Sequence, residues 1–181
     1  MAVVLPLTWA AATNAGASTA AAPKTLTNGL LPSSYFKGAG FPKVAEKVTT
    51  TTKTGQKTCP NAAEVAYESS SGREGLVSEL VACTTAKAAA ALLAGAKTGT
   101  SKTSGSPPKQ LGSSAIERSS GGSTYEIYWQ VGDIVEAVGL TTDVPASTSS
   151  STETTTPAPP MTSAEHKVLS GAAVAQNALP R

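Results

Sequence analysis

The sequence has few aromatic and few charged side chains, and this scarcity limits the kinds of protein it can encode. Phe, Trp and Tyr make up 4% of the chain and Asp, Glu, Lys and Arg 14%, whereas Ala, Ser and Thr fill long tracts. The net charge of +2, without a cluster of basic residues, provides no surface for tracking phosphates, so we expect no nucleic-acid partner. A length of 181 residues suits one domain with additional ends.

Residues suited to catalysis or metal binding are also scarce. His166 is the only histidine, and we expect it on the solvent side of a helix. Together with two separated cysteines it cannot complete a tetrahedral site, and no nucleotide-binding motif or G-x-S-x-G elbow is present, so we expect no metal and no cofactor. Ser34–Lys37 matches S-x-x-K, but the S-D-N element that accompanies it in penicilloyl serine transferases is missing. The sequence therefore predicts that the protein is not an enzyme.

The N-terminus has some, but not all, features of an export signal. Ala2–Ala12 is apolar but too short to span a membrane, and Ala15–Ala17 fits an A-x-A cleavage site. No basic residue precedes the apolar run, and the first is Lys24. The segment is either a truncated or weak signal or an Ala-rich tail. We favour the signal, and so expect an extracytoplasmic protein in which only the N-terminus could contact a membrane.

The two cysteines, Cys59 and Cys83, have different interpretations in different compartments. In a cytosolic protein they would be two buried thiols, whereas in an exported protein they would form one disulfide. Such a bond would close a loop of about 25 residues and stabilise the fold by about 3 kcal/mol. Because we favour export, we predict the disulfide.

Ser123–Leu140 carries the strongest strand pattern in the chain. A two-residue turn at Gly132-Asp133 between alternating apolar runs predicts an antiparallel hairpin. In that register Trp129 pairs with Glu136, and one face of the hairpin is apolar except for Glu136.

The other elements follow from shorter patterns. We expect helices after Leu30, at Thr85–Lys97 and from Thr162 to about Ala178, the last opened by an S/T-x-x-E capping box. We expect strands at Val44–Lys57 (an edge strand), Ala63–Ser69, Gly75–Thr84 and Leu111–Ser119. The predicted fold is α+β, an antiparallel sheet of about five to six strands with Ala-rich helices packed on one side. The predicted organisation is an export signal and tail (1–29), a globular domain (30–140), a Ser/Thr/Pro-rich linker (141–160) and a helix that returns to the domain (161–181).

Glu136 is the residue that a simple core does not explain. A buried carboxylate needs a partner, so either it lies near the rim of the hairpin or a bulge shifts the register. In the functional alternative it is a polar anchor in an apolar ligand pocket with Trp129, paired with Arg118.

The order of features resembles exported actinobacterial sensor-type domains, whose mycobacterial members include lipoproteins and the extracellular domains of receptor-like kinases. The resemblance lies in the leading Leu-Leu helix, the two cysteines, the Ala-rich helix, the Tyr/Trp hairpin and the closing M-T-x-A-E…A-x-x-Q-N helix. It implies a cleft for an unidentified envelope ligand, but one Cys pair stands where the kinase domains have two. We therefore expect a non-catalytic binding or sensor-like module for an envelope ligand or protein. A structural or surface-interaction protein is the second hypothesis, and a small hydrolase the third.

Overall fold

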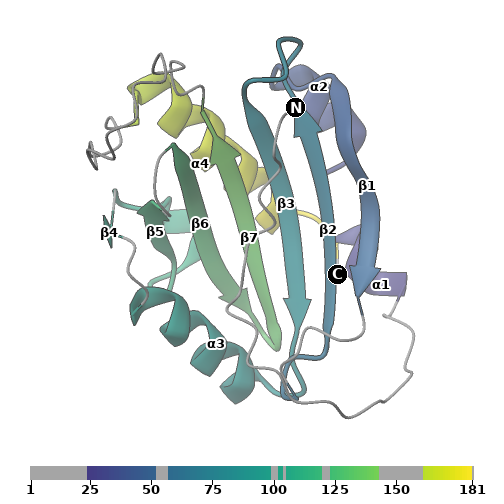
Figure 1. Cartoon of the computed structure of the whole chain (residues 1–181). Coiled ribbons are helices and arrows are strands. Elements are labelled where there is room, and N and C mark those ends of the chain that lie inside the picture. The colour runs from purple at the N-terminus through teal and green to yellow at the C-terminus, as the bar shows by residue number, and fades with distance from the viewer. Residues whose placement is uncertain are drawn as a thin grey trace, which may run out of the picture.

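The protein, described by a computed structural model over residues 24–51, 57–98, 102–103, 105–119, 123–142 and 161–180, forms one antiparallel sheet with helices alongside (Figure 1). The strands lie in the order β1-β2-β3-β7-β6-β5-β4. They are β1 Lys43–Thr51, β2 Asn61–Glu68, β3 Gly75–Ala82, β4 Lys102–Thr103, β5 Ile116–Ser119, β6 Thr124–Val131 and β7 Ile134–Thr141. The helices are α1 Lys24–Asn28, α2 Ser33–Gly38, α3 Ala86–Thr98, α4 Ser163–Asn177 and the 3-10 helix η1 Lys109–Leu111. The expected α+β class is confirmed.

Two parts of the predicted organisation differ from the structure at its edges. The two-residue strand β4 lies where a loop was expected and brings the strand count to seven. Residues 24–29 were expected in the tail, but α1 covers most of them and Leu26 is buried in the core. A Cβ atom at Gly29 would lie 2.8 Å from a methyl group of Leu80 on β3, so a larger residue would require that side chain to move. The expected signal before residue 24 and the linker at 143–160 lie outside the described residues.

The hairpin register predicted from the sequence is confirmed. β6 pairs with β7 so that Val131 lies opposite Ile134 and Trp129 opposite Glu136. The turn passes through Gly132, whose φ of +61° is in the left-handed region that glycine tolerates best. Because β3 pairs with the other edge of β7, the hairpin lies in the middle of the sheet.

Helices cover both faces of the sheet, not one. We call these the α3 face, which packs against α3, and the α4 face, which packs against α1, α2 and α4. Figure 1 shows α4, in yellow, passing behind β6 and β7, whereas α3 lies in front. Side chains alternate along β6, so Tyr128 points to the α3 face and Trp129 to the α4 face, and both are fully buried. Two large neighbouring aromatic side chains therefore require cover on both sides of the sheet.

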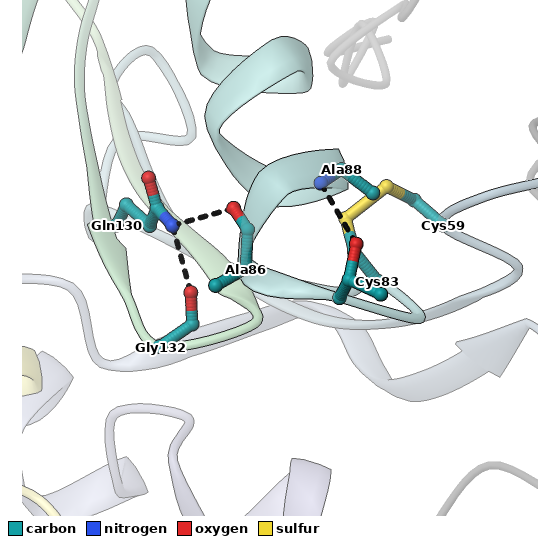
Figure 2. Close-up of a disulfide and its surroundings, with 7 residues drawn as sticks. Cys59, Cys83, Ala86, Ala88, Gln130 and Gly132 are labelled. Carbon is teal, nitrogen blue, oxygen red and sulfur yellow. Dashed lines mark hydrogen bonds between the residues drawn. A yellow bond between two sulfur atoms is a disulfide. The ribbon is translucent and has the colours of Figure 1, made fainter.

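The predicted disulfide between Cys59 and Cys83 is present. It joins the segment just before β2 to the residue just after β3, and both cysteines are buried in the cluster beneath α3. Figure 2 shows it beside the first turn of α3, where Gln130 also donates hydrogen bonds to the main-chain oxygens of Ala86 and Gly132. The bond and Gln130 together fix the start of α3 against the strands.

Helix α4 begins at the predicted capping box. The Glu165 main-chain N–H donates to Thr162 Oγ1 at 3.2 Å, and the Thr162 N–H donates to the Glu165 carboxylate at 2.6 Å. The helix then packs on β6, β7 and η1. No helix within the described ranges is long and apolar enough to cross a membrane.

Candidate functional site

Trp129 and Glu136, two of the three expected pocket residues, lie side by side on the α4 face. They are directly opposite each other across β6 and β7, and both are fully buried. On the other side of Glu136, Leu80 of β3 is its cross-strand neighbour. Glu136 is therefore in the centre of the sheet, not near the rim of the hairpin, and no register shift occurs there.

Gln176 of α4 supplies the polar contact that this position requires. Its Nε2 lies 3.5 Å from Glu136 Oε2 and donates to the main-chain oxygen of Glu79 at 3.1 Å. Its Oε1 accepts a hydrogen bond from Ser78 Oγ at 2.6 Å. Glu136, Gln176 and Ser78 are all fully buried, so these bonds offset the cost of placing polar groups in an apolar layer.

Trp129 contacts Asn177, the residue that follows Gln176 in α4. Its indole N–H donates to Asn177 Oδ1 at 3.2 Å. Asn177 Nδ2 in turn lies 3.4 Å from the main-chain oxygen of Gln110 in η1. The end of α4 thus connects the centre of the sheet with η1.

Arg118, the third expected pocket residue, lies on the opposite face. Its Nε donates to Glu126 at 2.8 Å, its Nη2 donates to Tyr128 Oη at 2.8 Å, and its guanidinium lies 4.6 Å from the Tyr128 ring centroid. Its Nη1 lies 3.3 Å from the main-chain oxygen of Ala96, near the end of α3. The structure therefore does not bring Arg118 to Glu136 and Trp129. Arg118 instead ties α3 to the sheet.

The electrostatics around Arg118 favour its charged form. Burial lowers the pKa of Arg118, but its interactions with Tyr128 and Glu126 raise it by more. The net pKa is therefore above its usual value. Burial, followed by the charge of Glu126, raises the pKa of Tyr128, which keeps its phenol protonated. Glu126 is itself almost fully buried, and Arg118 is its partner on this face.

The α3 face also carries carboxylates on neighbouring strands. Glu64 of β2 lies directly opposite Glu79 of β3, an arrangement that repels when both are charged. Burial and the nearby Glu46 of β1 raise the pKa of Glu64. Within the described residues no group of three His, Cys, Asp or Glu side chains could hold a metal ion.

His166 is not simply solvent-facing, a point that the sequence did not indicate. Its Nε2 lies 3.1 Å from Oε2 of Glu117 on β5, which is fully buried, and its Nδ1 lies 3.4 Å from Ser170 Oγ. The order carboxylate, histidine and serine has the composition of a hydrolase triad. Because both Ser170 and His166 are in α4, their main-chain N–H groups serve the helix ladder and cannot form an oxyanion hole beside the hydroxyl. This arrangement attaches α4 to β5.

The comparisons with known proteins identify a fold but no sequence family. No family profile and no curated protein matches the chain. Among solved structures, the chain is similar to the crystal structure of the extracellular domain of PknH from Mycobacterium tuberculosis, with a TM-score of 0.52 and 13% identity. The match covers 87% of this chain and 97% of that one. At this identity the likeness establishes the fold alone.

Proposed function

We propose that the protein is a non-catalytic binding domain that works outside the cytoplasm. The observation that carries this proposal is the fold, which nearly the whole chain shares with an extracellular domain of a mycobacterial protein. The buried disulfide between Cys59 and Cys83 supports it, because such bonds persist mainly in oxidising compartments.

The chemistry of the described residues supports a role without catalysis. The polar clusters on both faces hold helices to the sheet: Arg118 fixes α3, and Gln176, Asn177 and His166 fix α4. The residues Glu136 and Trp129 remain our candidates for ligand contact, now without Arg118.

The alternative function is a surface-interaction protein of the cell envelope, and the edge of the sheet favours it. Val44 and Val48 on β1 are each 53% exposed, the only large apolar side chains so exposed among those described. β1 lies at the end of the strand order and presents an unpaired backbone edge.

Three measurements on the full chain purified from its host test the proposal. Cell fractionation should place the protein outside the cytoplasm. Intact mass should show the loss of two hydrogens, and alkylation of the unfolded, unreduced chain should label neither cysteine. Reduction should lower the stability of the protein by about 3 kcal/mol, read as a lower melting temperature. Free thiols in a cytoplasmic fraction would contradict the proposal.

Native mass spectrometry separates the two functions. A small molecule or peptide that co-purifies in a fixed ratio supports a binding domain. An unliganded protein that self-associates, and that loses this association when Val44 and Val48 are both changed to Thr, supports the surface-interaction alternative.

A further inference from the structure

Asn28 and Gly29 form the one Asn-Gly pair in the sequence, at the point where α1 ends. Asn28 is the last residue of α1 and is exposed, whereas Gly29 is buried. An asparagine followed by glycine is especially prone to deamidation, because glycine has no side chain to shield its main-chain nitrogen from the preceding carboxamide. Asparagine is accordingly among the residues that thermostable proteins avoid. The pair is therefore a candidate site of spontaneous covalent modification.

The reaction needs only water and these two residues. The Gly29 nitrogen loses its proton and attacks the side-chain carbonyl carbon of Asn28. A new C–N bond closes a succinimide ring, the bond from that carbon to the carboxamide nitrogen breaks, and ammonia leaves. Water then opens the ring at either carbonyl and gives isoaspartate or aspartate. In isoaspartate the main chain runs through the former side chain and is longer by one methylene group.

The folded structure protects the nitrogen that must react. The Gly29 N–H donates to the main-chain oxygen of Leu26 at 3.3 Å, and the Leu30 N–H donates to that of Thr27 at 3.3 Å. Because Gly29 is buried and its N–H is hydrogen-bonded, base in the solvent reaches that proton only after this turn opens. Opening of α1 therefore limits the rate of deamidation.

α1 is a short element that can open without the rest of the domain. It has five residues, fewer than the roughly 12 below which an isolated helix is only marginally stable in water. Leu26, which is 2% exposed, anchors it in the core. We expect α1 to open at a lower free energy than the central strands, which separate only when the whole domain unfolds.

The chain that follows the pair leaves little room for a longer backbone. Gly29 lies against β3, where a Cβ atom would be 2.8 Å from a methyl group of the fully buried Leu80. Two residues later the Leu31 N–H donates to Ser78 Oγ at 3.0 Å, and this bond is also buried. Since the chain is fixed on this side, the extra methylene group of isoaspartate must displace α1. The new carboxylate also lies at the C-terminal end of a helix, where negative charge is unfavourable.

We propose that Asn28 is a deamidation site that reacts when α1 opens, and that its isoaspartate product leaves α1 unable to return to the core. The modification detaches α1 and exposes Leu26, while the hairpin of β6 and β7 and the helices α3 and α4 stay folded. The proposal does not depend on the binding function proposed above.

Peptide mapping by mass spectrometry measures the rate in the full-length protein. The purified chain is held at mildly alkaline pH, either folded or in urea, and the deamidated fraction of Asn28 is followed with time. The folded chain should react at least about tenfold more slowly than the unfolded chain. Leu26→Ala, which weakens the anchor of α1, should raise the rate in the folded chain at least about tenfold. Val44→Ala, at the exposed edge of the sheet, should leave that rate unchanged.

Two further variants complete the rate measurement. Asn28→Gln removes the reaction, because a glutamine side chain closes the corresponding ring far more slowly. Circular dichroism shows whether Leu26→Ala is folded, and if it is not, the smaller change Leu26→Val takes its place.

Hydrogen exchange on the separated products measures the effect on α1. Ion exchange isolates them, because deamidation lowers the formal net charge of +2 by one. Asn28→Asp is the matched control, since it adds the same charge without lengthening the main chain. In the isoaspartate form the amides of Gly29 and Leu30 should exchange at least about tenfold faster than in Asn28→Asp, and those of β6 and β7 should be unchanged.

Four results would overturn the proposal. Absence of deamidation in urea would mean that the pair is unreactive, and equal rates in the folded and unfolded chains would mean that the fold does not protect it. Equal rates for wild type and the Leu26 variant would mean that opening of α1 is not the limiting step. Unchanged exchange at Gly29 and Leu30 in the isoaspartate form would show that the core accepts the longer chain. None of these results concerns export or a bound ligand, so failure here is distinguishable from failure of the proposed function.

Discussion

The two faces of the sheet both place buried polar side chains under a helix, but they pair these side chains with different chemical groups. Tyr128 and Trp129 are neighbours on β6, both fully buried, yet they lie under different helices. On the α3 face a charged pair, Arg118 and Glu126, lies at the end of α3. On the α4 face the buried polar groups meet the amides of Gln176 and Asn177. The guanidinium of Arg118 remains partly exposed, whereas Gln176 is a fully buried amide that lies beside the fully buried carboxyl group of Glu136.

The difference also separates two kinds of attachment. The start of α3 follows β3 after a short connection. The Cys59–Cys83 disulfide and a hydrogen bond from Gln130 to Ala86 fix this end of the helix against the sheet. α4 follows a long connection and is held by side-chain contacts. The two helices therefore differ in how they are attached: a disulfide and a short connection fix the start of α3, whereas the packing of side chains into the main core holds α4.

The largest expected effect is on the α4 face. Trp129→Ala removes a fully buried indole and its bond to Asn177, and should destabilise the domain by about 4 kcal/mol in urea unfolding. Val44→Ala on the exposed edge is the control and should cost less than about 0.5 kcal/mol. A loss below about 1 kcal/mol for Trp129→Ala would mean that this face is not a packed core.

A smaller effect is expected at the charged pair of the α3 face. Arg118→Ala leaves the nearly buried Glu126 without this cation and should cost about 2 kcal/mol, because the arginine is itself partly exposed. Adding Glu126→Gln to Arg118→Ala should recover part of the loss. If the double variant is no more stable than Arg118→Ala in urea unfolding, the cost comes from lost packing on Tyr128 and not from an uncompensated charge.

The smallest expected effect is a pH dependence at Glu64. Its pKa is raised from 4.5 by burial and by Glu46, so the folded state holds this proton more tightly than the unfolded state does. Its contribution to stability therefore falls as the pH rises from about 4.5 through the raised pKa. Since Glu64 is partly exposed, Glu64→Gln should stabilise the protein by no more than about 0.5 kcal/mol at pH 8 and by nothing at pH 4.

Melting temperatures at the two pH values check this prediction. Glu74→Gln, at an exposed position, is the control for removal of a charge. An equal gain from Glu64→Gln at pH 4 and pH 8 would show that the effect is not due to ionisation.

Local patterns in the sequence predicted the elements that depend on near neighbours. The hairpin register and the capping box of Thr162 and Glu165 were predicted from spacing, and the helix after Cys83 from its Ala-rich composition. α1 was missed because five residues with one buried leucine carry no periodic signal. The expected approach of Arg118 to Glu136 failed because the register of β5 puts Arg118 opposite Glu126, on the other face from Trp129.

The partners of the buried polar groups could not be predicted, for a related reason. Gln176 and Ser78 are far apart in the chain, and so are His166 and Glu117. An amide at one helical position looks like any exposed glutamine until the docking angle of α4 is known. A signal did exist: Glu136 stood alone on an apolar face and required a partner, but it did not say which.

The sequence by itself determined an α+β domain, a central hairpin with Trp129 beside Glu136, and Cys59–Cys83 as the one possible cysteine pairing, whereas the formation of that bond depends on the compartment. These follow from alternation, turn chemistry and the number of cysteines, all of which act over short distances or few choices. The tertiary structure decided that both faces are covered and that Gln176 meets Glu136. Those outcomes depend on how helices that are distant in the chain pack on the strands.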